Sequence, residues 1–187
     1  MNKTIPLFVL SVCTFFLLSG CALMRPGAVS IQWPADINYM EAICELNMSW
    51  KDLQYSGEMS LMLYYPETLS LEVYGPFGDT VFSIEKKNGN FRMRTGNEEI
   101  TDEKRFHDIF KMKIEDFIND ITMRGYKAEN SDGTSYIQRE RYRVTYRLND
   151  TENTICWISS EGNICIRFLE VNFNRGQPVG KGSNKDL

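Results

Sequence analysis

The chain has 187 residues, of which 25 are acidic, 21 are basic and 42% are hydrophobic. This length and composition are typical of a single globular domain with a core of its own. The net charge of −4, without a basic patch, argues against a nucleic-acid partner. Lys3 is the one charged residue among the first 20, so without them the chain has 20 basic and 25 acidic residues, a net charge of −5.

The first 20 residues have the order of a secretory signal peptide. Lys3 precedes an apolar run over residues 5–18, and two small residues then lead to Cys21. A helix needs roughly 20 residues to cross a bilayer, so we expect the shorter run to be cleaved off. Residues 18–21, Leu-Ser-Gly-Cys, resemble the lipobox of bacterial lipoproteins, whose cysteine carries a diacylglycerol. The alternative is an ordinary signal peptide followed by a cysteine at this place by chance.

Lipidation of Cys21 predicts a membrane-anchored mature protein, because two acyl chains anchor stably where one does not. By the sorting rule of bacterial lipoproteins, Ala22 in place of aspartate favours the periplasmic face of the outer membrane over the inner membrane. We expect no cofactor besides this covalent lipid. Pro26, Gly27 and Pro34 interrupt any period, so we interpret residues 21–35 as the lipidated N-terminus and tether.

One domain is predicted over residues 36–175, followed by a flexible tail over residues 176–187. From Asp36 to Leu53 apolar residues recur mostly at helical spacing, which predicts an amphipathic helix capped by Asp36. Strands and turns follow. Two-residue alternation and turn residues predict strands over residues 59–65, 69–73, 81–85, 90–95 and 98–100.

A second amphipathic helix is predicted from Phe106 to Ile121, with Thr101 or Asp102 as its N-cap and Gly125 near its end. Asp120 and the other charged residues fall on its solvent side. The apolar side, which we expect to point inward, comprises Ile109, Phe110, Ile114, Phe117 and Ile121.

The remaining pattern predicts antiparallel hairpins. Residues 142–148 alternate strictly, and residues 154–159 and 164–173 form a further pair of strands. Cys156 and Cys165 flank the turn between that pair, so a cross-strand disulfide is possible in an oxidising envelope. The fold class is therefore α+β, mainly β: one strongly curved antiparallel sheet, an incomplete barrel, with helices on its concave face.

Motifs of catalysis are missing from this sequence, so we do not expect an enzyme. It has no G-x-S-x-G elbow, no H-E-x-x-H pair and no P-loop. His107, the single histidine, stands at a helix start and is interpreted as a surface or boundary residue. Glu98, Glu99, Asp102 and Glu103 form an acidic run, which at a helix start usually complements the dipole and predicts no metal site.

The order of these elements resembles the LolA/LolB family of lipoprotein carriers and outer-membrane acceptors. The likeness covers most of residues 36–173 and is sharpest over residues 68–84, where a strand ends in Gly-Pro-Phe-Gly before the next strand. Residues 112–125 stand in the place of the family's lid helix. The resemblance implies an incomplete barrel whose helix-covered cavity holds the acyl chains of a lipoprotein and passes them to the outer membrane.

The residues of this chain suit such a cavity. Seven of the nine methionines lie between Met40 and Met123, and flexible methionine side chains fill gaps that change shape. Tyrosines are candidates for the cavity edge, although aromatic and methionine side chains on sheets are more often plain core. The tyrosines concerned are Tyr64, Tyr65, Tyr74, Tyr142 and Tyr146.

Phe77 stands between Pro76 and Gly78 in a loop where a polar residue is usual. Its ring has three possible places: folded back on the core, in a partner's groove, or protruding towards lipid. The resemblance implies the third, with Pro76, Phe77 and Gly78 as a membrane-insertion loop. The implied partners are a membrane, lipoprotein acyl chains and a LolA-like periplasmic carrier, and we expect a monomer. The alternative function is an accessory envelope lipoprotein with a closed core, which uses the same fold as an interaction module.

Overall fold

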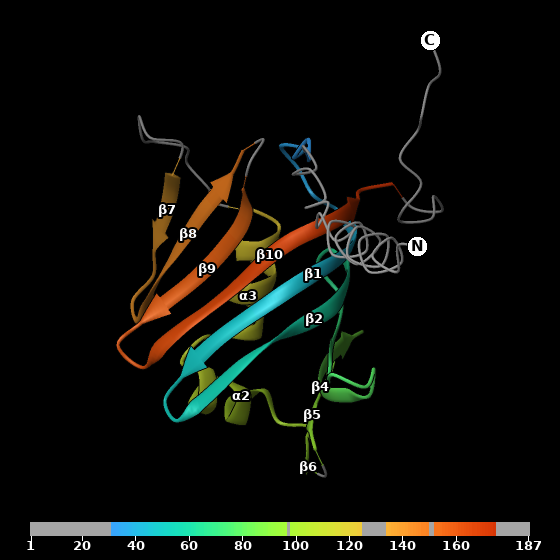
Figure 1. The fold of residues 1–187 in the computed structure, drawn as a ribbon, viewed down its shortest axis with the longest axis vertical. Coiled ribbons are helices and arrows are strands. Elements are labelled where there is room, and N and C mark those ends of the chain that lie inside the picture. The colour runs from blue at the N-terminus through green and yellow to red at the C-terminus, as the bar shows by residue number, and fades with distance from the viewer. Residues whose placement is uncertain (1–30, 97, 125–133, 150–151, 175–187) are drawn as a thin grey trace, which may run out of the picture.

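The computed structural model describes residues 31–96, 98–124, 134–149 and 152–174. They form one antiparallel sheet of ten strands and two short helices (Figure 1). The strand order is β6-β5-β4-β3-β2-β1-β10-β9-β8-β7, so the sheet is open, with β6 and β7 at its edges. In chain order the elements are β1 Tyr39–Trp50, β2 Leu53–Tyr64, β3 Thr68–Tyr74, β4 Thr80–Lys87, β5 Asn90–Thr95, β6 Glu98–Ile100, α2 Glu103–Phe110, α3 Ile114–Ile121, β7 Thr134–Gln138, β8 Tyr142–Leu148, β9 Asn153–Ser159 and β10 Gly162–Asn172.

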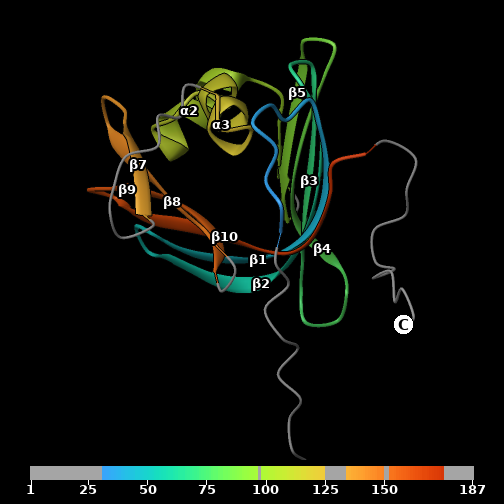
Figure 2. The same cartoon turned by 90° about the horizontal axis from the view of Figure 1, so that it is seen from above.

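The sheet bends around the helices. Figure 2 shows β3 and its neighbours turned steeply away from β1 and β10, with α2 and α3 on the concave side of the bend. Tyr142, Val144 and Tyr146 of β8 are buried on that side, whereas Arg143 and Arg147 are exposed. This pattern is typical of a sheet with one wet face. The predicted mainly β class and antiparallel sheet are confirmed.

The helix predicted over residues 36–53 is wrong, because this segment forms β1. β1 pairs with β2 on one side and with β10 on the other, which makes it a central strand. Its inward residues are all even-numbered, among them Met40, Ala42 and Trp50, and they alternate with polar residues such as Glu41. Alanine, glutamate, methionine and leucine favour helices in isolation, but pairing on both sides overrides that preference here.

The second predicted helix is divided into α2 and α3. Lys111 ends α2 in the left-handed conformation, with φ 57°, and its N–H donates to the carbonyl oxygen of His107. Asp102 caps α2 by accepting a hydrogen bond from the backbone N–H of Lys104 at 2.9 Å. α3 ends at Ile121, and Gly125 lies outside the described residues. The division lets two short apolar faces follow the curved sheet, which one straight helix does not do.

The strands predicted over residues 90–95 and 98–100 are confirmed as β5 and β6, and the three predicted C-terminal strands are confirmed as β8, β9 and β10. β2 begins at Leu53, earlier than the alternation predicts. β7 was not predicted. It is a five-residue edge strand with mixed burial, so it carries little periodic signal.

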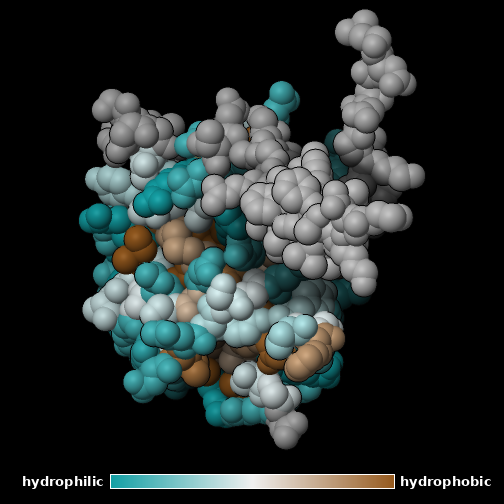
Figure 3. All heavy atoms as spheres, in the orientation of Figure 1, coloured by the Kyte–Doolittle hydropathy of each residue, from teal (hydrophilic) through white to brown (hydrophobic). Residues whose placement is uncertain are grey.

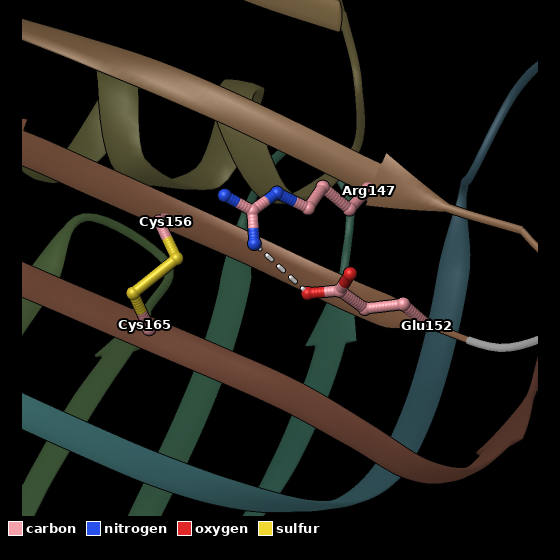
Figure 4. The surroundings of a disulfide bond; sticks show 4 residues. All are labelled: Arg147, Glu152, Cys156 and Cys165. Atoms are coloured by element: carbon pink, nitrogen blue, oxygen red, sulfur yellow. Dashed lines mark hydrogen bonds and ion pairs between the residues drawn. A yellow bond between two sulfur atoms is a disulfide. The ribbon is translucent and has the colours of Figure 1, made fainter. Parts of the chain in front are cut away.

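A disulfide joins Cys156 and Cys165, which face each other across β9 and β10. The bond lies on the outer side of the sheet, near the ion pair of Arg147 with Glu152 (Figure 4). Cys44 is a buried free thiol of β1, and burial raises its pKa far above the ordinary value. The disulfide therefore stabilises the hairpin from outside the core, and Cys44 is an unreactive core residue.

Candidate functional site

The space between the helices and the concave face is the candidate site for an acyl chain. Ile114, Phe117 and Ile121 of α3 are buried there, as predicted. Ile109 and Phe110 of α2 are only partly buried, and they pack against the edge of the same core. The residues predicted to point inward are therefore buried in α3 and only partly buried in α2.

Side chains fill this space. The rings of Phe117 and Trp157 lie 4.9 Å apart, and those of Phe91 and Phe106 lie 5.7 Å apart. Ile121, Val144 and Ile155 are each 0% exposed, so no void large enough for water adjoins them. Binding of an acyl chain at this place requires the helices to move from the sheet.

A buried carboxylate fixes α3 to the sheet. Asp120 is 0% exposed and accepts hydrogen bonds from Arg139 at 2.5 Å, from the indole of Trp157 at 3.1 Å and from the hydroxyl of Tyr142 at 3.2 Å. The hydroxyl of Tyr146 donates to its backbone carbonyl at 3.0 Å. Burial raises the pKa of Asp120, and the bonds from Arg139, Trp157 and Tyr142 oppose that shift. Four side chains that belong to the sheet or to its connections thus donate hydrogen bonds to Asp120 of α3.

The prediction that Asp120 lies on the solvent side is wrong. Periodicity places polar residues outside by default, and Asp120 stands beside Ile121 in a helix only eight residues long. A signal was available in the inward positions of β8 and β9, where Tyr142, Tyr146 and Trp157 each carry a polar group that needs a partner when buried.

A second polar anchor lies on the other half of the sheet. Lys86 of β4 is 9% exposed, and its ammonium contacts Glu103 of α2 at 2.8 Å and Glu115 of α3 at 2.5 Å. Burial lowers the pKa of Lys86, but its hydrogen bonds to the two carboxylates outweigh burial and raise it. The indole of Trp50 in β1 donates to the carbonyl oxygen of Ile109 at 3.0 Å. The helix pair is therefore fixed to both halves of the sheet.

Two hollows on the surface are polar and do not suit acyl chains. One of about 500 Å³ lies at the β4–β5 hairpin, where Lys87, Asn88 and Arg92 line it. Another of about 440 Å³ is lined by residues such as Asn47 and Asn163. The described residues on the face seen in Figure 3 are mostly teal and white, with brown apolar atoms in small patches.

The β3–β4 loop carries the most exposed large apolar residue among those described. Phe77 is 95% exposed, so its ring does not fold back on the core. The loop is tight, because the N–H of Gly75 donates to Asp79 at 2.7 Å and the N–H of Gly78 donates to Gly75 at 3.0 Å. Gly78 has φ 81°, a conformation that residues with a side chain rarely adopt. The loop therefore holds the ring away from the domain.

The tyrosines proposed for a cavity edge do not form one set. Tyr142 and Tyr146 are core residues bound to Asp120, and Tyr65 lies under the guanidinium of Arg124 at 3.7 Å. Tyr64 is 48% exposed, on the outer side. Four methionines are buried in the core: Met40, Met59, Met93 and Met112.

The acidic run at the start of α2 is accounted for by cations and by the helix cap. Glu98 pairs with Arg105, Glu99 pairs with Arg94 at 2.8 Å, and Glu103 pairs with Lys86. In residues 31–174, apart from the undescribed gaps, no group of three histidine, cysteine or acidic side chains is arranged to hold a metal. His107 is half-buried, 3.7 Å from Asp108.

Cys21, the predicted lipid site, lies outside the described residues. Within them, no helix has both the length and the apolar character that crossing a membrane requires. The described chain is a mainly β domain with one open, curved antiparallel sheet and a helix pair on its concave face. Its sequence matches no protein-family model. No curated protein matches it either.

Proposed function

We propose that this protein is a lipid-anchored acceptor of the LolA/LolB type, which takes up acyl chains of lipoproteins and helps to insert them into the outer membrane. The observation that carries the proposal is Phe77, whose ring is 95% exposed at the tip of a tight loop. Aromatic rings are favoured at the interface of a bilayer, whereas an exposed phenylalanine in water gains nothing. The curved sheet with helices on its concave face supports the same reading.

The proposed anchor is the lipid on Cys21, on the periplasmic face of the outer membrane. Cys21→Ala should release the domain from membranes without unfolding it, and labelling with a fatty acid should mark the wild type alone. Persistence of the alanine variant in membranes after a high-salt wash would show that the anchor lies elsewhere.

Phe77→Glu tests the loop. We expect the variant to keep the melting temperature and lipopeptide binding of the wild type but to lose transfer of bound lipopeptide to liposomes, because a charge is poorly accepted among lipid chains. Leu53→Glu is the matched control, since Leu53 is also an exposed apolar residue, at 59%, but stands at the β1–β2 turn. A fall in stability of about 3 kcal/mol for Phe77→Glu would indicate a buried ring and contradict the loop's role.

A second function is favoured by the filled core. If α2 and α3 stay on the sheet, the protein is an accessory envelope lipoprotein that uses the fold as an interaction module. The two functions differ in whether the lipid-free domain binds a fluorescent fatty acid that acylated peptide displaces. Binding with competition supports the acceptor, and failure to bind at any concentration tested supports the accessory protein.

A further inference from the structure

The segment before β1 packs onto the domain. We name residues 31–38 the strap. Ile37 is 1% exposed. Ile31 and Trp33 fall in the segment predicted to be a tether, but both pack against the core. Figure 2 shows the strap running between the helix pair and the β3 side of the sheet. It contains no helix or strand, so side chains and single hydrogen bonds hold it in place.

Trp33 occupies a seat formed by the end of β10 and the start of β9. Its ring lies 5.0 Å from that of Phe168 and 5.5 Å from that of Phe173, both in edge-on contact. Its Nε1–H donates to the side-chain oxygen of Asn153 at 3.1 Å. Phe168 and Asn153 are 3% and 6% exposed, so the seat is part of the concave face. It offers apolar ring surface and one hydrogen-bond acceptor.

The strap also contacts the end of α3. Arg124 follows α3, and its guanidinium donates to the side-chain oxygen of Asn38 at 2.7 Å. The backbone N–H of Tyr65 donates to the carbonyl oxygen of Asn38 at 2.9 Å. The last residue of the strap thus joins α3 to the β2–β3 turn. Departure of the strap would remove one of the contacts that hold α3 on the sheet.

We propose that the Trp33 seat is an acyl-chain binding site, which the strap fills in the closed protein and vacates when cargo enters. This inference rests on the proposed acceptor function. An acyl chain replaces the apolar contact of the indole with Phe168, and an amide N–H of an acylated peptide replaces its bond to Asn153. The strap can leave without breaking a β-ladder, since it belongs to none.

The position of the strap in the chain suits this role. Cys21, the expected lipid site, is twelve residues before Trp33, so the membrane anchor is at most roughly 40 Å of extended chain from the seat. The bilayer therefore stays within reach of this end of the domain. The β3–β4 loop lies away from the strap in Figure 1, so the proposal assigns cargo binding to the seat and delivery to Phe77.

Hydrogen exchange of the mature lipoprotein in phospholipid nanodiscs tests the proposal. The probe is a dipalmitoylated cysteinyl peptide, and the same peptide without acyl chains is the control. We expect the probe to accelerate exchange of the Tyr65 amide at least about tenfold, because its N–H loses the carbonyl oxygen of Asn38 when the strap departs. Phospholipid is present in both arms, so an effect of the probe alone separates acylated peptide from bilayer lipid. Bound probe with unchanged or slower exchange at Tyr65 overturns the inference.

Trp33→Ala provides a second readout. If the indole competes with cargo, this variant should bind the probe about tenfold more tightly than the wild type. The seat is then already vacant, so no free energy is spent on displacing Trp33 from it. Trp33→Phe keeps the ring contact and should stay near the wild type. Equal or weaker binding by Trp33→Ala, at an unchanged melting temperature, contradicts competition. Wild-type protein that binds no probe at all overturns the acceptor function itself, which is a distinct result.

Discussion

Replacement of Asp120 by alanine tests whether the helix pair is held on the sheet by this residue. The side chain is fully buried, and its two buried neutral donors are the hydroxyl of Tyr142, whose residue is 5% exposed, and the indole of Trp157, whose residue is 0% exposed. Each donor left without a partner costs about 1–3 kcal/mol. Arg139 is 28% exposed in its side chain and can be hydrated in the variant. Removal of a buried charge offsets part of the loss, so we expect unfolding free energy to fall by about 3 kcal/mol.

Urea unfolding of the lipid-free mature domain measures this change. Asp108→Ala is the matched control, because Asp108 is an aspartate of α2 with a side chain 63% exposed, and its loss should cost less than about 0.5 kcal/mol. We also expect Asp120→Ala to bind a fluorescent fatty acid more readily, since opening of α3 costs less. A decrease in stability below about 1 kcal/mol would refute the view that Asp120 anchors α3.

Three further changes test other parts of the structure. Phe117→Asp places an unpaired charge beside Trp157 and should lower unfolding free energy by at least about 3 kcal/mol in urea; retention of the wild-type melting temperature would show that the inward face is misassigned. Replacement of Cys156 and Cys165 by serine should cost about 2–3 kcal/mol and leave lipopeptide binding unchanged, because the disulfide closes a short loop outside the core; loss of binding would contradict this. Burial raises the pKa of Asp120, so the folded protein holds this proton more tightly than the unfolded chain. The stability that the protonated Asp120 contributes is therefore fully present below the ordinary aspartate pKa and is lost as pH rises through the raised pKa. Relative to Asp120→Asn, wild-type stability should fall as pH rises above the ordinary aspartate pKa, and a rise would contradict the assignment.

The sequence predicts the hairpins well because their signal is local. Strict alternation over β8 and the turn between Cys156 and Cys165 specify strands without reference to the rest of the chain. The β1 segment is different, since its helix-forming residues become a strand only through β2 and β10, which are distant in sequence. Local propensity does not contain that information.

The residues of the candidate site also differ in how well the local sequence predicts them. Exposure of Phe77 follows from a short loop between proline and glycine, both of which the sequence displays. Burial of Asp120 depends on Arg139, Tyr142 and Trp157, which lie 19 to 37 residues further along the chain. The seat of Trp33 joins residues 120 positions apart. A polar residue that is buried by distant partners gives no periodic signal of its own.

The closed core is consistent with an acceptor that must also release its cargo. Burial of one palmitoyl chain from water is worth on the order of 10 kcal/mol at about 0.8 kcal/mol per methylene. In the proposed function, however, the acyl chain comes from an apolar site of a carrier and not from water, and it leaves for the bilayer. Most of this free energy of burial would then be the same at every stage. The free energies of the acyl chain at the successive stages then differ by only a few kcal/mol. The contacts of Asp120, Lys86 and Trp33 that close the protein contribute free energies of the same magnitude. Contacts that favour the closed state weaken cargo binding and thereby favour transfer to the membrane. Mutations that loosen these contacts should therefore increase binding of acylated peptide and slow its release to liposomes.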